Sequence, residues 1–342
     1  MKEKHLQEKW KLIKKQRRVI KKSRKGYFMF ENKALTIIRI LGMKNRIDTT
    51  LLQAIVSKAE EEGAIMHIET CIGGAGLQPT RMLSQPEKAK WIINDKESRK
   101  SDLYTVLYQY PFTLIATCKK IKSDIYPYFI DKANNTYKKE KDNIHTTILT
   151  QIQRIDHISS KTESDKIIQA AITLLDYAGV NKKIEKQFTA FEENLSNIKF
   201  LYSRLKASEV TITNEDLFDI IKEYKNKKNV ILYIDPPYYL TDGGYPENCE
   251  DRESHKRLVD LLHKTSCKWV LFCRTQASRA YNSNNNSTLI DDALKSFYDN
   301  HYLSKGYYYS TWKCNKTEEL VITNFKFKNC KSYYLRSVSL QE

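Results

Sequence analysis

Short apolar runs alternate with amphipathic stretches along much of the chain. A short apolar run between turn signals predicts a buried strand, whereas apolar residues spaced three or four apart predict a helix. Strands that alternate with helices are typical of a parallel sheet covered by helices, so we expect an α/β fold. The predicted strands are 64–68, 91–93, 210–212, 230–234 and 269–273, and the predicted helices include 48–61, 217–225 and 252–264.

The middle of the chain has a different pattern, because residues 99–200 are mostly helical in their apolar spacing. This stretch is too long for an ordinary connection, so we expect an inserted helical subdomain. Near the C-terminus, two alternating segments on either side of Asn315 predict a hairpin that closes the sheet. The predicted organisation is a basic extension at 1–35, a sheet domain made of 36–100 and 201–330, a helical insert at 101–200 and a tail at 331–342.

The net charge of the chain indicates which class of partner it binds. The chain has 342 residues and a formal net charge of +17, with lysines and arginines crowded into residues 1–35. Such an excess favours a polyanion, and nucleic acid is the leading candidate. The basic extension is predicted either to contact phosphates or to be a solubilising tail.

The cysteine pattern and the apolar runs bear on compartment and cofactors. Seven cysteines are scattered without C-x-x-C spacing, which argues against a disulfide scaffold or a structural zinc site. No apolar run approaches the ~18 residues that a membrane span requires. We therefore expect a cytoplasmic protein that uses neither a membrane nor a metal.

The segment Asp235-Pro236-Pro237-Tyr238 follows the most apolar predicted strand, at 230–234. Asp235 and the carbonyl of Pro236 are two acceptors on a stiff turn, which suits the two N–H donors of an exocyclic amine. Holding both N–H bonds would direct the nitrogen lone pair at an electrophile, while Tyr238 offers a face on which a planar base could stack. The alternative is a simple turn with a solvated Asp and a packed Tyr.

Other predicted strands also end in polar residues. Ligands of open α/β sheets lie outside the carboxyl ends of the strands. Asp95 and Asp216 follow two of these strands, although each is equally suited to cap the next helix. Glu69 ends a third strand and precedes a small-residue loop that lets backbone approach a ligand. The glycines of that loop are Gly73, Gly74 and Gly76.

In this order the motifs resemble the Dam-type N6-adenine DNA methyltransferases, closest to the phage and Firmicute adenine methylases. Asp235–Tyr238 matches the family's Asp-Pro-Pro-Tyr motif. The glycine loop departs from the family pattern, because its second glycine is shifted and no aromatic precedes it. The other similar segments are 41–44 with its Gly-x-Lys, 69–76, 94–95, 214–218 and the final strand at 318–325.

The resemblance implies a Rossmann-like S-adenosyl-L-methionine-dependent methyltransferase fold, with the sheet domain as catalytic domain and the insert as target-recognition subdomain. It implies double-stranded DNA as substrate, a flipped-out adenine and a monomeric enzyme, which is either solitary or has a cognate restriction endonuclease as a further partner. The implied catalytic residues are Asp235, Pro236, Pro237 and Tyr238. The implied cofactor-binding residues are Lys44, Glu69, Gly73, Gly74, Gly76, Asp95, Asp216 and Leu217.

Two other functions remain open from the residues alone. The acceptors of the Asp-Pro-Pro-Tyr turn would serve another exocyclic amine equally well, such as adenine N6 in RNA or cytosine N4. A basic nucleic-acid-binding protein could also retain this fold as an inactive relic. Binding of S-adenosylmethionine separates the enzymes from the relic, whereas salt dependence does not, because every basic binder shows it.

Deleting residues 1–30 is predicted to weaken DNA binding of every sequence and to flatten its salt dependence, because phosphate contacts release counterions. Titration of labelled duplex DNA at several salt concentrations measures both effects. An unchanged affinity would identify the extension as a tail.

Overall fold

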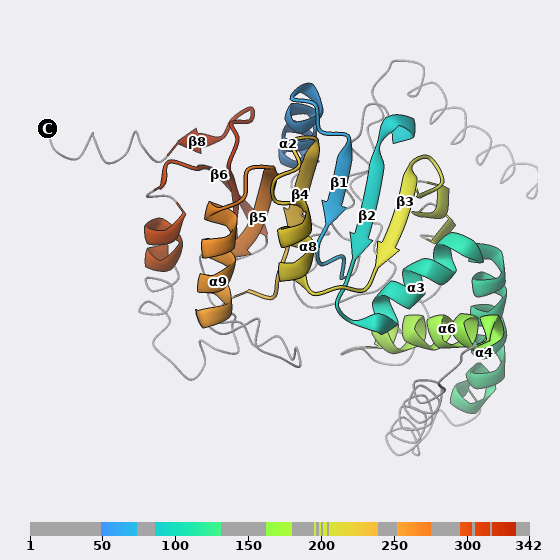
Figure 1. Ribbon diagram of the computed structural model, residues 1–342. Helices are drawn as coiled ribbons and strands as arrows, with labels where there is room; N and C mark the ends of the chain where they lie inside the picture. Colours follow the sequence, from blue (N-terminus) through green and yellow to red (C-terminus); the bar gives the residue numbers. More distant parts are fainter. Residues whose placement is uncertain are drawn as a thin grey trace, which may run out of the picture. The chain divides into compact units, whose positions relative to one another are not determined.

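Five strands of the computed structural model run parallel in the spatial order β3, β2, β1, β4, β5 (Figure 1). β7, β6 and β8 continue the same sheet in antiparallel fashion. The structure describes residues 49–73, 86–130, 162–179, 195, 198–199, 201–203, 205–238, 252–274, 295–302, 305–314 and 317–332. The strands are β1 (Met66–Glu69), β2 (Lys90–Asn94), β3 (Glu209–Thr213), β4 (Val230–Ile234), β5 (Lys268–Arg274), β6 (Tyr308–Cys314), β7 (Thr317–Thr323) and β8 (Lys331–Ser332).

The predicted α/β class and the closing hairpin are confirmed. β4 has the predicted bounds, and β6 and β7 form the hairpin, with β7 inserted between β5 and β6. The first predicted strand was 64–68, but β1 begins later, at Met66. The reason lies at the end of the preceding helix, where Gly63 has a φ of 85° and the N–H of Ala64 donates to the carbonyl of Ala59 (2.9 Å). This helix-ending turn uses the backbone that the strand would need.

Helices cover both faces of the sheet. On one face α2 (Thr49–Glu61) packs against β4, β5 and β7. On the same face α3 (Ser98–Gln109), α4 (Pro111–Ile130) and α6 (Glu163–Gly179) build a second cluster against β2. On the opposite face α8 (Leu217–Tyr224) and α9 (Arg252–His263) pack against β4 and β5. The described part of the predicted insert is therefore helical and shares a core with the sheet.

Buried apolar side chains of the strands pack against helices on both faces of the sheet. All five residues of β4 are buried, as expected for a central strand with helices on both faces. β3 is half-exposed, which fits its position at the edge of the sheet. No helix in the described parts of the chain combines the length and the apolar character needed to cross a membrane.

A polar pair lies inside this otherwise apolar core. The side chains of His67 and Tyr233 are buried, and Nδ1 of His67 lies 3.0 Å from the Tyr233 hydroxyl oxygen. Burial lowers the pKa of His67 to about 4, because a charged imidazole would lose its hydration there. The unfolded chain therefore takes up a proton on His67 at a higher pH than the folded chain does.

We expect this difference to destabilise the protein in mild acid. The stabilising effect of neutral His67 is complete above the unfolded pKa of about 6.5 and declines as pH falls toward 4. Between pH 7 and pH 5, the free energy of unfolding should fall by about 2 kcal/mol more in the wild type than in His67→Gln. Urea unfolding at the two pH values measures this difference, and equal pH dependence in both proteins would contradict it.

Candidate ligand site at the carboxyl edge of the sheet

The predicted site residues converge at one edge of the sheet. β1, β2, β3 and β4 are parallel neighbours, so their carboxyl ends lie side by side. Glu69 ends β1, whereas Asp95, Asp216 and Asp235 follow β2, β3 and β4. The chain order also reverses between β1 and β4, and such a switch point is where open α/β sheets bind ligands.

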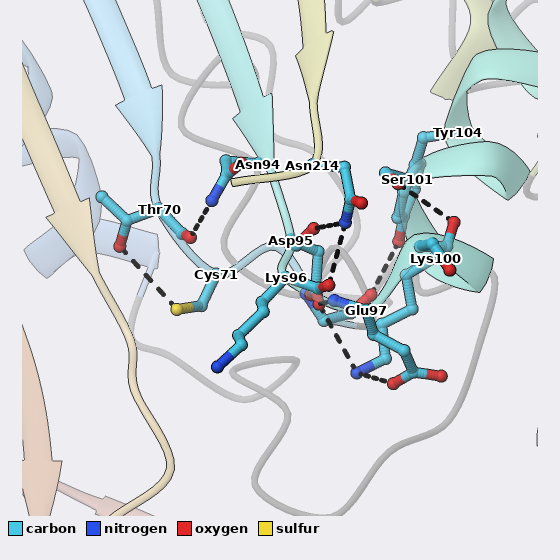
Figure 2. A network of polar contacts seen from close by, with 12 residues as sticks. Thr70, Cys71, Asn94, Asp95, Lys96, Glu97, Lys100, Ser101, Tyr104 and Asn214 are labelled. Atoms are coloured by element: carbon cyan, nitrogen blue, oxygen red, sulfur yellow. Dashed lines mark hydrogen bonds and ion pairs between the residues drawn. The ribbon is translucent and has the colours of Figure 1, made fainter. Parts of the chain in front are cut away.

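The side-chain amide of Asn94, the last residue of β2, links three of these strand ends, and Figure 2 shows its bond to Thr70. Its Nδ2 donates to the carbonyls of Thr70 and Glu215, both at 2.9 Å. Its Oδ1 accepts from the Thr213 hydroxyl (2.8 Å) and from the Glu215 N–H (2.9 Å). The Asn94 side chain is fully buried, and its bond to Thr70 is shielded from water, whereas the bonds to Thr213 and Glu215 are partly buried.

Thr70 carries the connection on to β4. Its backbone N–H and its hydroxyl both donate to the carbonyl of Tyr233, at 3.0 and 3.2 Å. The ends of β3, β2, β1 and β4 are thus joined by one continuous set of hydrogen bonds. This set holds the loops that leave the strands at defined positions, which a ligand site requires.

Asp95 fixes the start of the glycine loop. Its Oδ2 accepts from the Gly73 N–H (2.9 Å), and its Oδ1 accepts from the Glu97 N–H (3.0 Å). The Tyr104 hydroxyl donates to the Gly73 carbonyl (3.0 Å). Gly73 has a φ of 50°, in the left-handed region that favours glycine. Both backbone groups of Gly73 are therefore held by side chains that lie after β2.

Burial raises the pKa of Asp95, and the nearby Lys100 only partly opposes that effect. The Lys100 ammonium is 3.8 Å from Oδ1 of Asp95 and 2.7 Å from Oε2 of Glu97 (Figure 2). Capping of the next helix was one of the two predicted roles of Asp95, but α3 begins at Ser98 with Glu97 in the capping position. Asp95 instead supports the turn before that helix.

Asp216 has the capping role that was one of its two predicted roles. Its Oδ1 accepts from the Phe218 N–H (2.9 Å) at the start of α8. Its Oδ2 lies 3.4 Å from the ammonium of Lys96, in a contact that solvent screens because both side chains are over a third exposed. Leu217 is buried at the same helix end. A cap does not exclude ligand binding, because the carboxylate remains partly exposed at the edge.

The Asp-Pro-Pro-Tyr turn leaves β4 at the same edge. Asp235 is half-buried and Pro236 is buried. The carbonyl of Pro237 accepts from Nε2 of His255 in α9 (3.1 Å), and a carbonyl can only accept, so this nitrogen carries the proton. Tyr238 is 5% exposed and its hydroxyl donates to Oε2 of Glu319 (2.9 Å). Because the ring is almost fully covered, a base could stack on it only after the covering atoms move, so the stacking role stays a prediction.

Glu69, the last residue of β1, is buried. It pairs in register with Tyr233, whose side chain packs in the cluster with α2, and it is 1% exposed. Burial and the Glu69 charge both raise the pKa of Tyr233. A direct cofactor contact by Glu69 stays a prediction. Lys44, Gly74 and Gly76 lie outside the described residues, and so does the basic extension at 1–35.

The predicted site residues did not include several residues that contact the site, among them Asn94, Tyr104, His255 and Glu319. Asn94 and Glu319 lie in segments that resemble the family motifs. Asn94 bonds to Glu215 and Glu319 bonds to Tyr238, and each of these partners is more than 80 positions away in the chain. His255 and Tyr104 lie on helices, and no local pattern distinguishes them from other helical polar residues. Only the packing of the helices brings them to the edge.

Comparison with known proteins does not identify a family for this chain, and the described residues offer no metal-binding group. No protein-family model matches this chain, and no curated protein matches its sequence. Among the residues that the structure describes, no group of three or more His, Cys, Asp or Glu side chains could hold a metal ion. The geometry of the carboxyl edge therefore carries the functional argument.

We predict that Asn94→Asp lowers the free energy of unfolding by at least about 3 kcal/mol, because a buried carboxylate would face two carbonyls that now accept N–H bonds. Asn214→Asp is the matched control. Nδ2 of Asn214 also donates to two carbonyls, those of Asp95 (2.7 Å) and Lys96 (2.9 Å), but this residue is exposed. The control should lose less than about 1 kcal/mol in urea unfolding. Equal losses would mean that burial of Asn94 is not decisive.

Proposed function

We propose that this protein transfers a methyl group from S-adenosyl-L-methionine to the N6 amino group of a flipped-out adenine in double-stranded DNA. The observation that carries the proposal is the spatial order of the strand ends. The predicted cofactor residues Asp95 and Asp216 follow β2 and β3, whereas the Asp-Pro-Pro-Tyr turn follows β4, across the switch point. Donor and acceptor of a methyl group would then meet at one edge.

The chemistry of the edge fits the proposed cofactor. Ribose hydroxyls and an adenine amino group are donors, and carboxylates such as Asp95 and Asp216 are acceptors. The left-handed Gly73 beside Asp95 keeps side-chain atoms out of the loop where a ligand would approach. When bound, S-adenosylmethionine supplies a methyl group that its sulfonium has already activated.

The chain's own contribution is to orient the amine. Asp235 and the carbonyl of Pro236 would accept its two N–H bonds, and the prolines keep these acceptors at a fixed separation. His255 holds the carbonyl of Pro237, which stiffens the same turn. Rate enhancement would come mainly from orientation, because a fixed near-attack arrangement removes much of the entropic barrier.

The DNA partner is inferred from the net charge of the chain. A net charge of +17 favours binding of a polyanion. The target base must leave the duplex to reach a turn at the edge of a sheet, as in other enzymes that modify bases. We assign target recognition to the helical insert at 101–200, which includes most of α3 and all of α4 and α6.

The first test is incorporation of labelled methyl from S-adenosylmethionine into double-stranded DNA of mixed sequence, followed by nucleoside analysis. N6-methyladenine is the expected product. Asp235→Ala should reduce transfer at least about a thousandfold, because one of the two acceptors for the amine is lost, while cofactor affinity measured by calorimetry stays within about twofold.

The other outcomes are distinct. Methylated cytosine, or transfer to RNA alone, would replace the proposed substrate with another exocyclic amine. No transfer and no cofactor binding by the wild type would favour the inactive relic. Loss of cofactor affinity in Asp235→Ala would mean that Asp235 shapes the cofactor site instead.

A further inference from the structure

Tyr238 and Glu319 form a buried polar contact beside the proposed catalytic turn. The Tyr238 hydroxyl donates to Oε2 of Glu319 at 2.9 Å, and the two residues are 5% and 4% exposed. A hydrogen bond to a carboxylate that is shielded from water is among the stronger ones in proteins. It therefore restricts the orientation of the Tyr238 ring far more than packing alone would.

The topology of the sheet explains how Glu319 reaches the turn. β7 runs antiparallel to β5, so its first residues lie at the carboxyl edge of the parallel strands. Glu319 pairs in register with Arg274, the last residue of β5, and β5 extends beyond the end of β4. The bond between Tyr238 and Glu319 thus joins the turn after β4 to β7, which lies on the far side of β5 in the sheet. A parallel strand in that position would have presented its carboxyl end and a different residue.

The turn has a second anchor of a different kind. His255 of α9 donates to the Pro237 carbonyl, which fixes the backbone one residue before Tyr238. With the backbone held and the prolines rigid, the remaining freedom of the turn lies in the Tyr238 side chain. The bond to Glu319 removes that freedom.

We propose that Glu319 is a positioning residue, which orients Tyr238 for the target base without touching the base itself. This inference rests on the proposed function, because it requires that Tyr238 contacts a substrate base. A side chain that is ordered before the substrate arrives loses less conformational entropy when the substrate binds. Precise placement of the ring also places the amine relative to Asp235 and the Pro236 carbonyl.

The test is a double-mutant cycle with Tyr238→Phe and Glu319→Leu, which remove the two ends of the same bond and keep the bulk of both side chains. Each single variant should lower kcat about ten- to a hundredfold with cofactor affinity within about twofold of wild type. The double variant should be no slower than the slower single variant, because the bond is already lost. Rates are normalised to the number of cofactor-binding sites, so that unfolded protein does not count.

Two further variants separate positioning from general stability. Glu319→Gln keeps an oxygen that accepts from the Tyr238 hydroxyl and should retain kcat within about fivefold. Thr323→Val is the matched control on the same strand. The buried Thr323 hydroxyl donates to the Phe325 carbonyl (2.6 Å). Thr323 pairs with Val270 near the start of β5, whereas Glu319 pairs with Arg274 at its end, so the control lies far from the turn. It should lose stability but keep kcat.

The bond between Tyr238 and Glu319 can also be measured without catalysis. Urea unfolding of the wild type, Tyr238→Phe, Glu319→Leu and the double variant should give a coupling free energy between Tyr238 and Glu319. This coupling reports the hydrogen bond whether or not the protein is active. Unchanged or increased kcat in Glu319→Leu, with an active wild type, would overturn the positioning role. Absence of coupling in both measurements would overturn it as well. An inactive wild type is the separate result that rejects the proposed function, and the positioning role with it.

Discussion

The buried amide of Asn94 is the interaction on which the carboxyl edge depends. Its four hydrogen bonds join the ends of β1, β2 and β3, and Thr70 continues the connection to β4. An amide can do this because it offers two donors and an acceptor oxygen with two lone pairs, and here each is satisfied. A carboxylate or an apolar side chain of similar size would leave buried backbone groups unpaired.

The hydrogen bonds of Asn94 and Thr70 fix the positions of the loops at this edge. Asp95, one residue beyond Asn94, holds Gly73, and Tyr104 holds the other side of the same glycine. The acidic side chains at the edge thus serve the fold as well as the proposed chemistry. Asp216 caps α8 while its carboxylate stays partly exposed, so structural and ligand-binding roles are compatible at one residue.

The antiparallel hairpin contributes more than closure of the sheet. By inserting β7 beside β5, it brings Glu319 to the edge where the parallel strands end. The Asp-Pro-Pro-Tyr turn is consequently supported from two independent elements, α9 through His255 and β7 through Glu319. Stiff prolines with two external anchors make a preorganised turn, which is the property that a proposal of catalysis by orientation requires.

The sequence by itself determined the α/β class, the strand at 230–234, the closing hairpin and the polar residues at the strand ends, because these follow from local periodicity and turn chemistry. Local pattern also predicted that Asp216 could cap a helix. The tertiary structure decided which faces the side chains occupy, and it buried Glu69 and turned Tyr238 toward Glu319. It also decided the partners of Asn94 and His255. These contacts join residues far apart in the chain, and they form only when strand order and helix packing bring them together.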